Sequence, residues 1–251
     1  MIPTEHIALS FVSCASNWEV LSQRLLTSPC LQAGGQSLAV HFNSLSAADG
    51  FNATLSSLSG AADGATASGW LVWVHQDVFL PAAWDTRFKL ALAQALQHFA
   101  QLAVVGVYGV TGSGTQARRS GHVLDRGVLL QEAAALPCLV DSLDELLLAV
   151  RVDSGLRMDP TLGFDFYGTD LVMQAQQRGL QCAVVDAYCE HWATTPASGA
   201  ISSTLAQRIQ SSAAVFERKW AQRLPVSTPC FEINKVGDVA AFIASVGVTP
   251  P

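Results

Sequence analysis

The stretch that decides the fold is Trp70-Leu-Val-Trp-Val-His-Gln-Asp-Val-Phe-Leu80. It opens with apolar and aromatic residues only, and an apolar run of about 4–8 residues indicates a strand buried on both faces of a parallel sheet. His75, Gln76 and Asp77 follow this strand directly. Ligands of open α/β sheets bind outside the carboxyl ends of the strands. Asp77 is therefore a candidate functional acid, although an aspartate here can also simply cap a turn.

The residues before this stretch alternate between strand and helix patterns. Residues 7–12 and 37–42 read as strands. Residues 18–26 carry apolar side chains at helical spacing, and a weaker helix is expected over 46–55. The order strand, helix, strand, helix, strand favours parallel pairing of the three strands.

The rest of the chain extends this α/β pattern. We expect helices over 82–100, 170–179 and 205–220, strands over 103–110, 123–130, 138–140 and 181–186, and a polar, flexible loop over 111–121. Residues 141–150 form either a capped helix or a strand. The predicted fold is one α/β domain over residues 1–225, with a mostly parallel central sheet flanked by helices, followed by a tail of uncertain structure over 226–251.

Composition narrows the class of protein. The chain has 251 residues, of which 50% are hydrophobic and only 14% charged, and its formal net charge is −6. It has no run rich in Lys or Arg, so we expect no nucleic-acid partner. No apolar run reaches the roughly 18–20 residues of a transmembrane segment. The six cysteines include no CxxC pair, which favours reduced thiols and a cytoplasmic location.

Familiar catalytic motifs are missing from the sequence. Gly106, Gly109, Gly112 and Gly114 suggest a dinucleotide-binding loop, but a GxGxxG motif should directly follow the first strand and open a helix. These glycines begin inside the expected fourth strand instead. The sequence also contains no P-loop, no GxSxG and no HExxH motif.

Three residues remain as candidates for chemistry. Asp77 follows a buried strand, Asp170 opens a helix and His191 follows another strand. A carboxylate and an imidazole together suit a divalent metal that holds a diphosphate. A carboxylate at a helix start is kept ionised by the helix dipole and can act as a general base. Alternatively, Asp170 caps its helix and His191 is merely packed beside Trp192.

Several further segments, in this order, resemble one protein family. Besides the HQDV core of the opening stretch, they are Asn43-Ser-Leu-Ser-Ala-Ala-Asp-Gly-Phe-Asn52, the strand and glycine loop of 105–121, Val140-Asp-Ser-Leu-Asp-Glu145, Arg157-Met-Asp159 and Phe164-Asp-Phe-Tyr-Gly-Thr-Asp-Leu171. Together they resemble bacterial glycosyltransferase-like proteins grouped with a streptomycin-biosynthesis protein and related to the family 2 glycosyltransferases of the GT-A fold. The resemblance covers about residues 6–225.

The resemblance implies a GT-A fold and an inverting transfer of a sugar from a nucleotide-diphosphate sugar to an acceptor hydroxyl, the acceptor being unknown. It implies that Asp77 and His191 hold Mg²⁺ or Mn²⁺ and that Asp170 is the catalytic base. The residues that it places around the nucleotide-sugar are Ser13, Asn17, Asn43, Asn52, His75, Gln76 and Asp77.

The sequence departs from the family pattern at three positions. His75 stands where the first acid of the DxD-like motif is expected, Asn43 where relatives often have an acid, and Asp165 where the family has a histidine. These departures leave an alternative: a catalytically degenerate GT-A domain that binds a nucleotide-sugar or a partner protein. A nucleotidyltransferase is a weaker rival, because the turn over 13–18 has no glycine and no basic residue.

Overall fold

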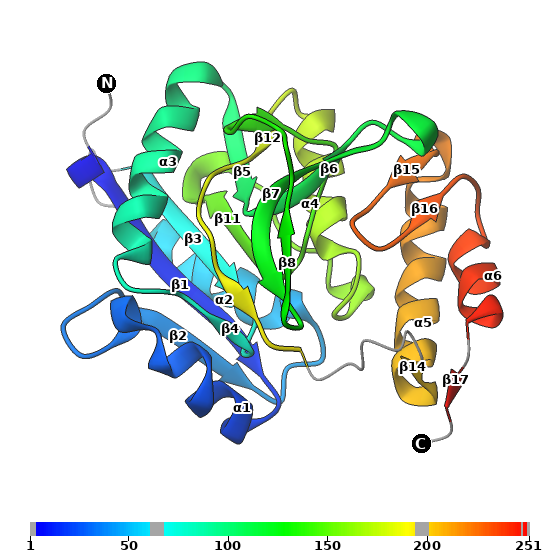
Figure 1. The fold of residues 1–251 in the computed structure, drawn as a ribbon, viewed down its shortest axis with the longest axis horizontal. Helices are drawn as coiled ribbons and strands as arrows, with labels where there is room; N and C mark the ends of the chain where they lie inside the picture. Colours follow the sequence, from blue (N-terminus) through cyan, green and yellow to red (C-terminus); the bar gives the residue numbers. More distant parts are fainter. Residues whose placement is uncertain (1–3, 61–67, 194–200, 247, 250–251) are drawn as a thin grey trace.

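A computed structural model describes residues 4–60, 68–193, 201–246 and 248–249. A seven-stranded sheet runs through the molecule, and helices cover both of its faces (Figure 1). Its strands, in spatial order, are β2 (Leu38–Phe42), β1 (Ile7–Ala15), β3 (Ser68–Val74), β11 (Leu147–Arg151), β5 (Leu102–Gly106), β12 (Gln181–Val184) and β9 (Cys138–Leu139). The α/β class predicted from the sequence is confirmed.

The sheet is partly rather than mostly parallel. β1 pairs in parallel with β2 and β3, as the order of the first elements predicts, and β5 pairs in parallel with β12. β11 runs antiparallel to both β3 and β5, and β9 runs antiparallel to β12. Of the two structures left open for residues 141–150, the strand is the one that forms. All but the last of its five residues are buried.

The helices form two layers that bury different side chains of the same strands. They are α1 (Trp18–Gln23), α2 (Ala47–Gly60), α3 (Trp84–His98), α4 (Tyr167–Gln177), α5 (Ser203–Lys219) and α6 (Asp238–Ser245). α1 and α3 pack on the face that carries Val72 and Val74, whereas α2 and α4 pack on the face that carries Leu71 and Trp73. This alternation along β3 explains why its sequence is apolar throughout.

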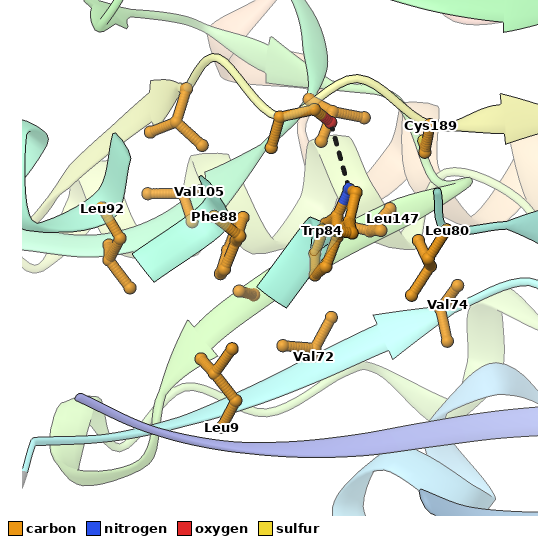
Figure 2. Packing of buried hydrophobic residues seen from close by; sticks show 14 of the residues in the cluster. Leu9, Val72, Val74, Leu80, Trp84, Phe88, Leu92, Val105, Leu147 and Cys189 are labelled. Carbon is orange, nitrogen blue, oxygen red and sulfur yellow. Dashed lines mark hydrogen bonds between the residues drawn. The ribbon is translucent and has the colours of Figure 1, made fainter. Parts of the chain in front are cut away.

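The core under α3 is closely packed. Figure 2 shows Trp84 and Phe88 of α3 above Val72 of β3, with Leu147 of β11 beside Trp84. The rings of Trp84 and Phe88 stack with their centroids 4.7 Å apart, and the Trp84 indole donates a hydrogen bond to the Ala187 carbonyl over 3.4 Å. The ring nitrogen of this buried tryptophan therefore has an acceptor, as burial requires.

A second, smaller sheet has six strands. Its strands are β10 (Ser142–Leu143), β6 (Tyr108–Thr111), β7 (Arg118–Asp125), β13 (Glu190–His191) and β4 (Val78–Phe79), with β8 (Val128–Gln131) paired to β7. The loop expected over 111–121 is shorter in the structure, since its first residue and its last four belong to strands. β6 continues to Thr111 and β7 begins at Arg118, because the two strands pair with each other across a short turn.

Short 3₁₀ helices connect several of these elements. They span Thr4–His6, Leu25–Thr27, Pro29–Leu31, Gly114–Gln116, Val152–Ser154, Pro160–Leu162 and Ala221–Arg223. No helix among the described residues is both long and apolar enough to span a membrane.

The C-terminal segment forms a third apolar cluster with α5. It contains β15 (Val226–Ser227), β16 (Glu232–Ile233), α6 and β17 (Val248–Thr249), which pairs with β14 (Ile201–Ser202). α5 and α6 lie side by side at one end of the molecule (Figure 1). Phe216 of α5 and Trp220, which directly follows this helix, pack with Ile233 and Ile243. The tail after residue 225 thus has regular structure that is anchored on α5.

We expect Leu148→Ala to lower the free energy of unfolding by about 2–5 kcal/mol, because it opens a cavity in a close-packed core. Leu148 is fully buried in the central strand β11. Leu90→Ala is the matched control, since Leu90 lies on α3 with 57% of its surface exposed. It should change stability by less than about 0.5 kcal/mol. Equal effects of the two changes in urea unfolding would contradict this packing.

Candidate metal centre and binding cavity

A cavity of about 570 Å³ lies at the carboxyl ends of β1, β2 and β3. This is the edge at which parallel sheets bind ligands. The residues that line it are Cys14, Ala15, Ser16, Asn43, Ser44, Trp73, His75, Gln76, Asp77, Phe164, His191, Ala193 and Arg208. The site predicted after the opening strand is therefore hollow and open to a ligand.

Three of the lining residues can together hold a metal ion. One ligand atom from each of His75, Asp77 and His191 lies within 4.8 Å of the other two. His191 Nε2 lies 3.4 Å from Asp77 Oδ1, and His75 Nδ1 lies 4.0 Å from the same oxygen. Among the described residues this is the one such group of three or more His, Cys, Asp or Glu side chains. We refer to it below as the triad.

Backbone hydrogen bonds fix the positions from which the triad projects. The His75 N–H donates to the Leu146 carbonyl over 3.0 Å, which ties the end of β3 to the start of β11. β13 then pairs antiparallel with β4 so that His191 lies opposite Val78, and the Trp192 N–H donates to the Asp77 carbonyl over 3.0 Å. Residues more than 110 positions apart in sequence are thus held together by sheet pairing.

The ring of His75 makes its second contact with a buried tyrosine. His75 Nε2 lies 2.6 Å from the hydroxyl of Tyr167, at the start of α4. That hydroxyl also lies 3.0 Å from the Trp73 indole nitrogen and 3.2 Å from the Glu145 carbonyl oxygen. Burial lowers the pKa of His75 to about 4, although Asp77 opposes the shift. His75 is therefore a neutral imidazole at neutral pH.

The ring of His191 makes its second contact with a carboxylate. His191 Nδ1 lies 2.8 Å from Asp125 Oδ1, and Arg126 holds the other oxygen of Asp125 at 2.8 Å. Burial alone would lower the pKa of His191, but Asp125 and Asp77 outweigh it and raise the pKa to about 10. The hydrogen bond from His191 in turn lowers the pKa of Asp77 against the effect of burial. In the metal-free protein, His191 is an imidazolium between two carboxylates.

Gln76 joins the triad to the turn after β1. Its Oε1 accepts hydrogen bonds from the backbone N–H groups of Ser16 and Asn17, each over 3.0 Å. Asn43 lines the cavity at the end of β2 in a left-handed conformation with φ 58°, which asparagine adopts more readily than most residues. The carboxyl ends of β1, β2 and β3 therefore form one continuous wall.

Some predicted nucleotide-binding residues do not reach the cavity. Ser13 is fully buried, and its hydroxyl has no hydrogen-bond partner among the described residues. The Asn17 side chain caps α1 by accepting from the Val20 N–H. The Asn52 amide bonds both backbone groups of Met158. These side chains support the fold, whereas Asn43, His75, Gln76, Asp77 and His191 line the cavity.

Asp170 lies outside the cavity and is completely buried. One carboxylate oxygen lies 2.7 Å from Lys219 Nζ and accepts from the Trp220 indole over 2.8 Å. The other accepts from Gln174 over 2.7 Å. Because these three groups occupy the carboxylate, its position does not support a role as the base that receives a proton from an acceptor. It instead ties α4 to α5.

Three residues important to the site escaped the sequence analysis. Arg208 reaches the cavity from α5, but it looks like any exposed charge on an amphipathic helix. Asp125 ends β7, whereas the sequence pattern predicts a single strand over 123–130 that continues past it. Tyr167 belongs to the motif around Asp170, and its role becomes visible only once the helix is placed against β3.

No protein-family model matches this sequence, and no curated protein matches it either. The family resemblance noted in the sequence therefore stays a prediction.

The two histidines should give opposite pH signatures in metal-free protein. His75 has a lowered pKa, so it destabilises the fold progressively as the pH falls from about 6.5 towards 4. His191 has a raised pKa, so its stabilisation is complete below about pH 6.5 and is lost as the pH rises towards about 10. The free energy of unfolding is measured against pH by urea unfolding in the presence of a chelator. His75→Gln should reduce its pH dependence on the acid side, and His191→Gln should reduce its pH dependence on the alkaline side. The reverse pattern would contradict these assignments.

Proposed function

We propose that this protein transfers a sugar from a nucleotide-diphosphate sugar to an acceptor hydroxyl, assisted by a divalent metal ion. The main support is the convergence of His75, Asp77 and His191 inside a cavity at the carboxyl ends of β1, β2 and β3. A volume of about 570 Å³ is in the range of small-molecule sites. The resemblance of the sequence to glycosyltransferase-like proteins points to the same chemistry.

The donor would lie along the wall formed by the three strand ends. Ser16, Asn43 and Ser44 offer polar groups on one side of the cavity, at the ends of β1 and β2. The triad lies at the end of β3. A nucleoside placed against the first group would direct its diphosphate towards the triad. In this arrangement the acceptor approaches from the side of Phe164.

Arg208 supplies positive charge across the cavity. Its Nε and Nη2 atoms each lie 3.0 Å from an oxygen of Asp165, so the guanidinium is held in a two-bond contact. Half of the side chain stays exposed. Burial opposes ionisation of Arg208, but Asp165 raises its pKa, so the guanidinium stays charged. A fixed guanidinium is well suited to a phosphate oxygen.

The donor atoms of the triad fit a divalent metal. The resemblance implies Mg²⁺ or Mn²⁺, and such an ion, when bound, would neutralise charge on the leaving diphosphate. Arg208 would bind the same diphosphate from the other side. The acceptor oxygen would attack the anomeric carbon, the bond from this carbon to the diphosphate oxygen would break with its electron pair leaving on that oxygen, and the hydroxyl proton of the acceptor would pass to water. Asp170, and the inverting geometry that it implied, form no part of the proposal because of its burial.

A panel of nucleoside diphosphates and their sugars, titrated calorimetrically with and without Mn²⁺, tests this proposal. We expect metal-dependent binding of one nucleotide, loss of that binding in Asp77→Ala, and sugar transfer or slow donor hydrolysis by the wild type. Binding without any turnover would favour the catalytically degenerate nucleotide-sugar-binding domain. Absence of binding across the whole panel would overturn both readings.

Arg208→Gln should weaken binding of the diphosphate by about 10–100-fold, because a hydrogen bond to a charged group contributes about 1.5–3 kcal/mol. Arg218→Gln removes the same charge from an exposed position on the same helix and should leave the affinity within about twofold. The comparison separates contact with the ligand from general electrostatic attraction. Equal losses in the two variants would remove Arg208 from the donor site.

A further inference from the structure

We infer that the triad selects a divalent transition metal that accepts imidazole ligands, such as Mn²⁺, Co²⁺ or Zn²⁺, over Mg²⁺, and that Tyr167 and Asp125 are its positioning residues. This inference rests on the metal site of the proposed function but not on sugar transfer. It narrows the Mg²⁺ or Mn²⁺ expectation drawn from the sequence. It also gives a role to two side chains outside the triad.

The donor set itself disfavours Mg²⁺. The triad offers two imidazole nitrogens and a single carboxylate. Mg²⁺ prefers oxygen ligands in an octahedral arrangement, whereas imidazole suits transition metals and zinc. His75 stands where the DxD-like motif has its first acid. This histidine therefore shifts the preference of the site from Mg²⁺ towards metals that accept imidazole, and the site still has three ligands.

The contacts of Tyr167 determine which nitrogen of His75 is available. The tyrosine hydroxyl has one hydrogen, and the Glu145 carbonyl at 3.2 Å can only accept it. In the tautomer that we assign, this hydrogen goes to Glu145 and His75 Nε2, at 2.6 Å, donates to the hydroxyl oxygen. A proton on Nδ1 instead would face Asp77 at 4.0 Å, too far for a hydrogen bond. The assigned tautomer leaves the lone pair on Nδ1, which is the atom that faces Asp77.

Asp125 orients His191 in the same way. It accepts from Nδ1 over 2.8 Å and is held in place by Arg126, so Nε2 is the nitrogen directed at Asp77. Histidines that bind metals usually donate their other ring nitrogen to such a partner, which fixes the ring and strengthens the ligand. Both triad histidines have this outer contact, although His75 follows β3 and His191 lies in β13.

The triad is held rigidly and leaves room for a substrate. The ring of His75 packs edge-on against Trp73, with centroids 6.3 Å apart, and against His191, with centroids 5.6 Å apart. All three ligand residues line the cavity. Three protein ligands with open positions facing a cavity are typical of catalytic rather than structural metal sites.

Calorimetric titration of the chelator-treated full-length protein with MnCl₂, CoCl₂, ZnCl₂ and MgCl₂, without nucleotide, tests the inference. We expect one equivalent of Mn²⁺, Co²⁺ or Zn²⁺ to bind at least about tenfold more tightly than Mg²⁺. Asp77→Ala should abolish that equivalent, which separates the triad from the six free thiols. Mg²⁺ binding as tight as that of Mn²⁺, or retention of the equivalent in Asp77→Ala, would overturn the inference.

The positioning residues are tested by Asp125→Asn and Tyr167→Phe, each of which should weaken Co²⁺ binding by about 10–100-fold and alter its visible absorption spectrum. Asp186→Asn and Tyr108→Phe are matched controls that should change neither. Asp186 faces His122 at 3.4 Å, and Tyr108 bonds Glu132, both outside the cavity. If Tyr167→Phe does not fold, Asp125→Asn decides, and an unchanged Co²⁺ affinity and spectrum would refute the assignment.

The metal titrations, taken together with the nucleotide-sugar panel, separate the metal inference from the proposed function. Selective metal binding combined with no response to any nucleotide-sugar would keep the metal site and overturn sugar transfer. Nucleotide binding supported equally well by Mg²⁺ would keep the transferase proposal and overturn the metal preference.

Discussion

The pairing of β13 with both β4 and β7 is the constraint on which the candidate site depends. His191 lies opposite Val78 of β4, one residue after Asp77, and beside Asp125 of β7. Because side chains alternate along a strand, a slip of one residue would turn His191 to the other face and present Glu190 to the two carboxylates. β13 has only two residues in the ladder, so the hydrogen bond from Trp192 to the Asp77 carbonyl and the contact between His191 and Asp125 help to hold the register.

Charge balance explains why these particular groups lie together. Asp77 and Asp125 are both mostly buried and lie on either side of one imidazole. Two carboxylates in such a place repel each other unless positive charge lies between them. In the metal-free protein the imidazolium of His191 supplies it, which is why its pKa is raised to about 10 despite burial. A divalent cation bound by Asp77 and His191 would supply that charge instead, and its binding would release a proton from His191.

The local elements were readable from the sequence, whereas the long-range pairings were not. The strands at 7–12, 37–42 and 70–74, and the helices at 82–100 and 205–220, match β1, β2, β3, α3 and α5 closely. The sequence could not predict that β11 runs antiparallel to β3 and β5. A short apolar run gives no sign of the direction in which the strand will pair, and both partner strands are distant in sequence. The turn after Asp125 was missed since Arg126, with φ 50°, adopts a left-handed conformation that arginine seldom favours. At the site, His75, Gln76 and Asp77 were found because they directly follow a recognisable strand.

The role of Asp170 depends on how α4 is rotated about its own axis. An α-helix turns about 100° per residue, so Tyr167 and Asp170 point only about 60° apart around α4. That difference directs Tyr167 towards His75 and buries Asp170 against Trp220 and Lys219 of the α5 region. The sequence predicts a helix over 170–179, which leaves Tyr167 outside it, and a sequence pattern cannot fix the rotation of the helix. Since α5 also carries Arg208 into the cavity, the Asp170 contacts would affect the site by setting where α5 lies, rather than by transferring a proton.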